Sequence, residues 1–309
     1  MPGRRPAGEG RLLQLVYYGY VAGSALARAL PERWVYALAQ WAGGLAATRS
    51  KRSAQVAANL ARIAGQPADS EEVRALVVDA YRSYARYWLE TFRLVREGRE
   101  FFLERFRGID EHNIDDALAL GKGVVVAVGH LGNWDAAGAW VGARGNRLVT
   151  VAEVLRPRRV FDFFAEHRAR LGMTIYGAEP GVTAKLVDEA AGGAVVAVLA
   201  DRDLKGTGVE AEFFGEPATF PRGAASIALR AGVPVIIGGV YERPLPDGRR
   251  GWVAELSAPV PMPDGDGEAA VDELTRTIAA RLEQCVARHP EQWHVFQPFW
   301  IADRSARAR

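Results

Sequence analysis

Residues 123–135 have the sequence GVVVAVGHLGNWD. The consecutive apolar residues at 124–128 show no polar alternation, which predicts a strand buried on both faces of a sheet. Gly129 and Gly132 then indicate a turn, and Asn133 is suited to cap a following helix. The stretch therefore predicts a strand, a turn and a helix, which is the unit from which α/β folds are built.

The same alternation continues along the chain. Further strands are predicted at 148–152, 173–176, 194–199, 233–240 and 251–256. Helices are predicted at 114–120, 160–171, 182–191 and 223–231. We therefore expect an α/β fold with a mostly parallel central sheet flanked by helices, preceded by a helical N-terminal portion that associates with a membrane.

The flanking regions are predicted to be helical. Apolar residues recur every three or four positions within 12–48 and 70–106, and Ser70 or Asp69 is suited to cap the second run. No linker is long enough to separate two domains. We expect a single domain over 1–309, made of a helical portion (12–106), an α/β core (108–260) and a C-terminal helix with an aromatic tail (268–303).

Composition excludes several classes of protein. Of 309 residues, 49% are apolar and 25% are charged, enough for a compact core. The 39 basic and 37 acidic residues give a net charge of only +2, so no nucleic-acid partner is expected. The single cysteine, Cys285, excludes an internal disulfide and a cysteine-rich zinc site. The histidines lack the paired spacing of a metal-binding helix, so no metal or other cofactor is expected.

An uncharged apolar run at 12–27 follows Arg4 and Arg5. It is shorter than the about 20 apolar residues that a membrane-spanning helix needs, and its tyrosines are typical of a membrane interface. We favour a helix that lies in the membrane surface, with the basic residues of 49–52 on anionic headgroups or in solvent. The alternatives are a helix packed on the protein core, and a spanning helix or cleaved signal.

His130 lies where the predicted buried strand ends, the place where ligands and catalytic groups gather in open α/β sheets. A histidine there can act as a general base, and a carboxylate can fix its tautomer. Asp135 can reach it only if a turn intervenes, because five helical residues rotate a side chain by about 140°. The alternative is a plain turn in which both residues cap backbone groups. The spacing of Gly129 and Gly132 does not match a dinucleotide-binding motif.

These residues resemble a known family. His130 and Asp135 match the H-x4-D motif of the lysophospholipid (glycerolipid) acyltransferase superfamily, and GKGVVVAVGHLGNWD at 121–135 resembles the lipid A late acyltransferases. DRDLKGTGVEAEFFGE at 201–216 and the stretch 219–236 extend the likeness. PEQWHVFQPFW at 290–300 resembles the actinobacterial phosphatidylinositol mannoside acyltransferases.

The resemblance implies a membrane-associated acyltransferase. It would move a fatty acyl chain, expected to be palmitoyl, from acyl-CoA as co-substrate to a hydroxyl of a mannosylated phosphatidylinositol. His130 would be the general base and Asp135 would support the imidazolium. The enzyme would be peripheral, at the cytoplasmic face of the cell membrane. The alternatives are a lipid A-like or lysophospholipid acceptor, and a non-catalytic lipid- or acyl-binding protein.

In the mannoside acyltransferase branch a later glutamate pairs with the catalytic histidine. Glu210 is the preferred candidate, with Glu212 on the same face of a β-like stretch. Asp201 and Asp203 are rivals, because a carboxylate following the predicted strand at 194–199 would also reach the carboxyl edge of the sheet.

Three further residues are substrate-binding candidates on the same resemblance. Glu153 follows a predicted strand, and Arg168 lies on a predicted helix where a structural salt bridge is an equal alternative. Arg222 stands in the FPRG sequence at 220–223, in place of the acid of the superfamily's F-P-E-G motif, and its planar guanidinium could contact phosphate directly. Backbone N–H groups of 129–133, or Arg168, are candidates for stabilising the oxyanion.

Overall fold

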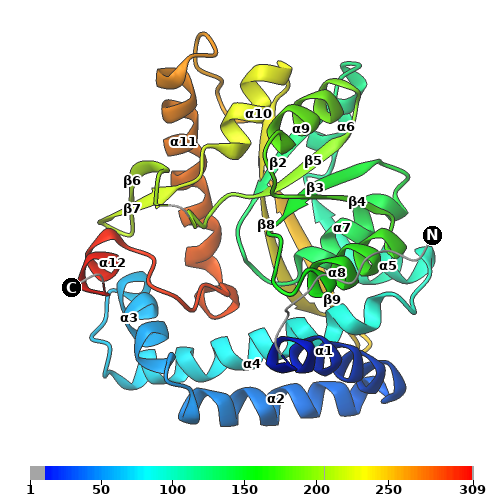
Figure 1. Cartoon of the computed structure of the whole chain (residues 1–309), viewed down its shortest axis with the longest axis vertical. Coiled ribbons are helices and arrows are strands. Elements are labelled where there is room, and N and C mark those ends of the chain that lie inside the picture. Colours follow the sequence, from blue (N-terminus) through cyan, green and yellow to red (C-terminus); the bar gives the residue numbers. More distant parts are fainter. Residues whose placement is uncertain (1–10, 205, 308–309) are drawn as a thin grey trace.

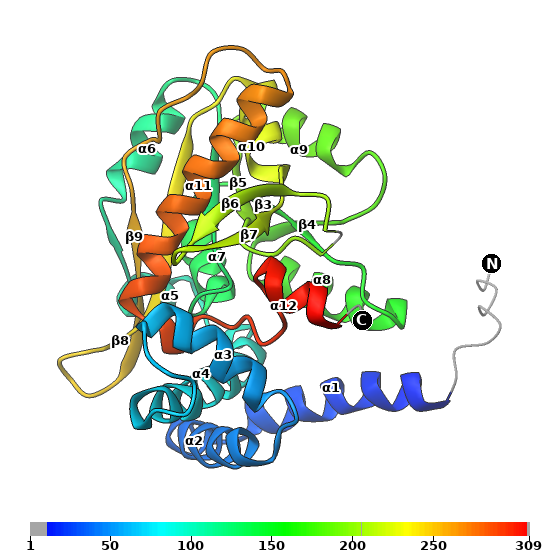
Figure 2. The same ribbon diagram turned by 90° about the vertical axis from the view of Figure 1, so that its left-hand side faces the viewer.

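The computed structural model describes residues 11–204 and 206–307. Within them a central sheet lies between two layers of helices, with further helices gathered at one end of the molecule (Figures 1 and 2). The described sheet has seven strands in the order β1-β9-β8-β2-β5-β3-β4. Neighbours run parallel except the antiparallel pair β8–β9. The predicted α/β fold with a mostly parallel sheet is confirmed.

The strands of this sheet are β1 Phe106–Ile109, β2 Val124–Val128, β3 Leu148–Ala152, β4 Met173–Gly177, β5 Val195–Leu199, β8 Val235–Pro244 and β9 Arg250–Leu256. A separate antiparallel hairpin joins β6 Val209–Phe213 to β7 Glu216–Phe220. The helices are α1 Arg11–Ala29, α2 Glu32–Arg49, α3 Ser53–Ala64, α4 Glu71–Leu94, α5 Arg99–Arg105, α6 His112–Ala119, α7 Trp134–Ala143, α8 Arg158–Arg170, α9 Val182–Ala191, α10 Gly223–Ala231, α11 Glu268–Arg288 and α12 Ile301–Arg307, with the 3-10 turn η1 Pro290–Gln292.

Strand β2 is buried on both faces, as its uninterrupted apolar sequence predicts. Val125 and Ala127 join the core formed with α9, α10 and α11, whereas Val124 and Val126 join the core formed with α5, α6 and α7. Successive side chains of a strand point to opposite faces, so a strand covered on both sides has no polar position. Burial of this kind fixes β2 at the centre of the sheet.

The predicted N-terminal helices are divided by local breaks. The run predicted at 12–48 is two helices, because Pro31 cannot continue α1 and instead precedes α2. Ser70 caps α4 by accepting from the Val73 N–H at 3.2 Å. The run predicted at 70–106 is also two helices, α4 and α5, separated at 95–98, and its last residue, Phe106, instead begins the short strand β1, which pairs with β9. The single-domain organisation remains a prediction.

Helix α1 contains the apolar run at 12–27. One side packs against α4 and α8 and buries Ala27, while Leu15, Tyr18 and Leu26 on the other side are exposed. In the part of the chain that the structure covers, no helix combines the length and apolar character needed to cross a bilayer. Arg4, Arg5 and Lys205 lie outside the described residues.

Candidate active site

The turn after β2 carries His130 and is held in a conformation that needs glycine. Gly132 has φ +58°, and a Cβ atom there would lie 2.3 Å from the Val240 carbonyl oxygen. Asn133 then caps α7, its side chain accepting from the Ala136 N–H at 3.0 Å. The predicted order of strand, turn and capped helix is confirmed, and it places His130 at the carboxyl edge of the sheet.

The carboxylate that binds His130 is Asp201. His130 Nδ1 lies 2.7 Å from Asp201 Oδ1, and the His130 backbone N–H donates to Asp201 Oδ2 at 2.8 Å. An ionised carboxylate only accepts hydrogen bonds, so Nδ1 carries the proton and Nε2 is the basic nitrogen. Asp201 is fully buried, whereas the His130 side chain keeps 15% of its surface exposed. An imidazole held in this way can accept a proton from a bound hydroxyl group.

The sheet itself brings these two residues together. Strands β2 and β5 are parallel neighbours, with Val128 opposite Leu199. Each strand ends there, and His130 and Asp201 each follow two residues later. The carboxyl ends of parallel strands meet at one edge, so the register of these strands places Asp201 beside His130.

Asp201 is ionised in this setting. Burial alone would raise its pKa, but the adjacent His130 and its two hydrogen bonds, together with the Trp293 indole N–H at 2.9 Å, lower the pKa of Asp201 below its ordinary value. The negative charge can therefore stabilise a protonated His130.

Asp135 does not occupy the position expected for it. Its carboxylate is 2.9 Å from the Tyr87 hydroxyl and 2.5 Å from Arg168 Nε, and it is buried among these groups. Residue 135 already lies in the first turn of α7, and helical rotation directs it toward α4 and α8 rather than toward the His130 ring. The bond expected between His130 and Asp135 is therefore replaced by the one to Asp201.

Arg168 forms a salt bridge with Asp135, which is the structural alternative considered for it from the sequence. Burial would raise the pKa of Asp135, but Arg168 and the Tyr87 hydroxyl outweigh it and lower that pKa. Beside this pair, His167 Nε2 lies 2.6 Å from the Thr91 carbonyl oxygen. Arg168 is thus already engaged by a buried carboxylate, so α7 and α8 are tied to α4 at this point.

Glu210, the preferred partner of His130, lies on strand β6. Val209 and Ala211 are buried while Glu210 and Glu212 are exposed, so the two glutamates do share one face, as expected. That face is turned to solvent. The residue joined to His130 is the rival candidate Asp201, and the expectation for Glu210 is corrected.

The remaining candidates have separate settings. Glu153 is exposed just beyond β3, at the same edge of the sheet as His130, since β3 pairs in parallel with β5. Arg222 precedes α10 and binds Asp272 at 2.8 Å. Asp203 accepts from the Gly206 and Gly208 backbone N–H groups and shapes its own loop. No contact between these three residues and His130 is found in the described residues.

Sequence reasoning missed the role of the C-terminal segment in fixing the turn. The His294 N–H donates to the His130 carbonyl oxygen at 2.7 Å, and the Gly132 N–H donates to the Gln292 carbonyl oxygen at 3.0 Å. Trp293, in the predicted aromatic tail, is buried and also donates to Asp201. Hydrogen bonds between residues so far apart in the sequence cannot be predicted from local sequence patterns.

The backbone of the turn has little free donor capacity. The N–H groups of His130, Leu131 and Gly132 donate to Asp201, to the Gly129 carbonyl and to the Gln292 carbonyl, respectively. Groups already engaged within the protein are poor candidates for an oxyanion site. The expectation that these three N–H groups stabilise an oxyanion is therefore not supported by the geometry.

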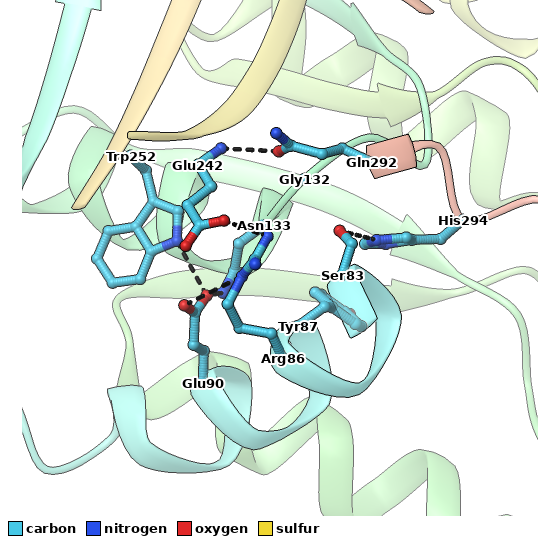
Figure 3. Close-up of a pocket in the computed structure, with 10 residues that line it drawn as sticks. All are labelled: Ser83, Arg86, Tyr87, Glu90, Gly132, Asn133, Glu242, Trp252, Gln292 and His294. Carbon is cyan, nitrogen blue, oxygen red and sulfur yellow. Dashed lines mark hydrogen bonds and ion pairs between the residues drawn. The ribbon is translucent and has the colours of Figure 1, made fainter. Parts of the chain in front are cut away.

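A small buried pocket lies beneath the turn, between it and α4 (Figure 3). Glu90 accepts there from the Asn133 amide at 2.9 Å and from the Trp252 indole at 3.0 Å. Burial raises the pKa of Glu90, opposed in part by Arg86, which also binds Glu242 at 2.5 Å. This polar network supports the residue that caps α7 and thereby the turn above it.

Comparison with known proteins shows the class of this chain. The model of the bacterial lipid A biosynthesis acyltransferase family matches residues 6–301. The chain belongs to this family and is an acyltransferase.

Several individual proteins are similar to this chain over most of its length. The chain is 35% identical over 298 residues to the phosphatidylinositol mannoside acyltransferase of Mycobacterium tuberculosis (strain CDC 1551 / Oshkosh), covering 94% of this chain and 90% of the relative. It is 34% identical over 316 residues to the protein of that name from Mycolicibacterium smegmatis, covering 100% and 98%. Among solved structures it is similar to the 1-acyl-sn-glycerophosphate acyltransferase PlsC of Thermotoga maritima, at 13% identity and a TM-score of 0.38, covering 81% of this chain and 96% of the other.

Proposed function

We propose that this protein transfers a fatty acyl chain from acyl-CoA to a hydroxyl group of a phosphatidylinositol mannoside, with His130 as the general base. The observation that carries the proposal is the pairing of His130 Nδ1 with buried Asp201, which leaves Nε2 as the basic atom. The names of the relatives support the choice of acceptor.

In the proposed reaction Nε2 removes the hydroxyl proton of the acceptor as its oxygen attacks the thioester carbonyl carbon. The tetrahedral intermediate then collapses, the carbon–sulfur bond breaks, and the imidazolium returns the proton to the leaving thiolate of CoA. The products are an ester and free CoA. Asp201 stabilises the imidazolium between the two proton transfers, and no acyl-enzyme is required.

The donor chain is proposed to be palmitoyl, and the enzyme is proposed to work as a peripheral protein at the cytoplasmic face of the cell membrane. Exposed apolar side chains on the N-terminal helices support this position: Leu15, Tyr18 and Leu26 on α1 and Trp34 and Trp41 on α2. Exposed basic residues Arg33, Arg49, Lys51 and Arg52 lie near them in sequence and can contact anionic headgroups.

The test is turnover with defined lipids. Purified protein is given labelled palmitoyl-CoA and phosphatidylinositol dimannoside, and the lipid products and free CoA are measured. Formation of an acylated dimannoside with an equal amount of CoA supports the proposal. If only a lipid A precursor or a lysophospholipid is acylated, that lipid is the acceptor in place of the mannoside. If the protein retains acyl-CoA and releases no CoA, it is a binding protein.

A further inference from the structure

A second cavity lies next to the loop that follows Asp201. Its volume is about 350 Å³, within the range of small-molecule sites. Two segments distant in sequence form it, the loop after β5 and the C-terminal segment that leads into α12. The lining includes Arg202, Asp203, Leu204, Gln297, Phe299 and Arg304.

The cavity is positively charged. Among the ion pairs of the described residues, none includes Arg202 or Arg304, whereas Arg62 and Arg222 each bind carboxylates. Arg304 Nη1 donates to the Thr219 hydroxyl at 2.8 Å. With the Gln297 amide turned so that its oxygen faces Arg202, that oxygen accepts from Nε at 2.5 Å and from Nη2 at 3.0 Å.

The described lining of the cavity includes the carboxylate of Asp203, which binds backbone N–H groups of its own loop. Asp203 accepts from the Gly206 N–H at 3.0 Å and from the Gly208 N–H at 2.8 Å, and its side chain is buried. The carboxylate thus holds the shape of the loop. Two guanidinium groups without a carboxylate partner in the described chain therefore share one cavity.

This cavity is adjacent to the His130–Asp201 pair. Arg202 follows Asp201 directly, and the Phe299 ring in the lining lies 4.9 Å from the Trp293 ring. The Trp293 indole in turn donates to Asp201 at 2.9 Å. A ligand held in the cavity would therefore be anchored beside the residues that hold the base.

We propose that Arg202 and Arg304 bind a phosphate group of one of the two substrates. A guanidinium presents a planar fork of donors that matches phosphate oxygens, and charge-assisted bonds of this kind are strong. The exposed Leu204 side chain and Pro298, both in the lining, can contact the organic part of the same molecule. The inference rests on the proposed function for the identity of the substrates, since both the CoA donor and the phosphoinositide acceptor carry phosphate.

The test compares Arg202→Gln and Arg304→Gln with Arg249→Gln, which removes an arginine from the exposed β8–β9 turn. Titration calorimetry measures binding of CoA, of 3′-dephospho-CoA and of glycerophosphoinositol, and thermal unfolding checks the fold. Each cavity variant should weaken one phosphate-bearing probe by about tenfold, which is about 1.4 kcal/mol, while Arg249→Gln matches the unaltered protein.

The probes distinguish the source of the phosphate. Weaker binding of CoA alone assigns the site to the donor, and the dephospho form tells whether the 3′-phosphate is the group bound. Weaker binding of glycerophosphoinositol alone assigns it to the acceptor. If a folded Arg304→Gln variant binds all three probes as Arg249→Gln does, the proposal is wrong. Arginine-dependent probe binding by a protein that forms no acylated lipid would support this site while overturning the proposed function.

Discussion

Asp201 binds His130 at two points, with Oδ1 on the ring Nδ1 at 2.7 Å and Oδ2 on the backbone N–H at 2.8 Å. One carboxylate thus orients the imidazole and also fixes the start of the turn that carries it. A substitution at Asp201 should consequently affect the tautomer of the base as well as its position.

Replacing Asp201 by Asn should lower kcat by about 10²- to 10⁴-fold. The amide nitrogen would donate to Nδ1 and move the imidazole proton to Nε2, where it blocks general-base action. Glu210→Gln is the matched comparison, since Glu210 is exposed on β6, and its kcat should stay within a factor of about two of the unaltered enzyme. Steady-state CoA release measures both. Equal losses in the two variants would contradict the assignment of Asp201.

Replacing His130 by Ala should lower acyl transfer by about 10²- to 10⁴-fold without abolishing substrate binding. The side chain keeps 15% of its surface exposed, so the variant should fold. Single-turnover acyl transfer, with circular dichroism as the check of folding, gives the result. A folded His130→Ala protein with undiminished turnover would remove the general-base mechanism.

Replacing Arg168 by Gln should lower the free energy of unfolding by about 3–5 kcal/mol, because it leaves the buried Asp135 carboxylate without its cation. Adding Asp135→Asn should recover part of that loss, because the unpaired charge is then gone. Urea unfolding of the single and double variants measures the coupling.

Arg158→Gln is the control for that series, since it breaks only exposed pairs, with Asp162 and Glu179, and stability should be nearly unchanged. If Arg168 instead only bound substrate, the Arg168→Gln variant would have a higher KM and the same urea unfolding curve as the unaltered protein.

His294 should make stability fall in mild acid. Burial, with Arg86 and His130 nearby, lowers the pKa of His294 well below its usual value of 6.5. As the pH falls through about 6.5, the unfolded chain gains a proton that the folded chain does not, so the free energy of unfolding falls. His294→Gln should reduce the loss between pH 7.5 and 5.5 by on the order of 1 kcal/mol. Urea unfolding at the two pH values checks this, and an identical pH slope in the variant would refute it.

Replacing both Trp34 and Trp41 on α2 by Ser should weaken binding to anionic vesicles by about tenfold or more. Each substitution removes a large apolar side chain from the surface that would contact the headgroup region. These side chains are 56% and 66% exposed. Leu120→Ser is the control, because Leu120 is 77% exposed but follows α6, far along the sheet from α2 (Figure 1). Vesicle sedimentation measures both proteins, and equal binding by them would argue against α2 as the contact surface.

Much of the fold could be predicted from sequence because it depends on local pattern. The strand at 124–128 is apolar at every position, and such a continuous apolar run is typical of a strand buried on two faces. Strand β1 was missed because Phe106–Ile109 is short and follows a helical segment, so its pairing with β9 decides its structure.

The candidate site was predicted only in part. His130 was identified from its place after β2, but the identity of its acid depends on the register of β2 with β5 and on the rotation of α7. Trp293 bonds to Asp201 across 92 residues of sequence, a relationship set by tertiary packing alone. The local sequence therefore identifies the candidate residues, but which of them bind one another is decided by the tertiary structure.

The direct pairing of β2 with β5 also makes the positions of His130 and Asp201 independent of the long segment that connects these two strands in sequence. From residue 134 to residue 194 the polypeptide moves away from His130, forms β3 and β4 on the far side of β5, and returns through β5 to Asp201. Loops at that outer margin can lengthen or shorten while interstrand hydrogen bonds hold the two reactive groups at a constant separation. Changes in the length of these loops would thus leave the hydrogen bonds between His130 and Asp201 in place.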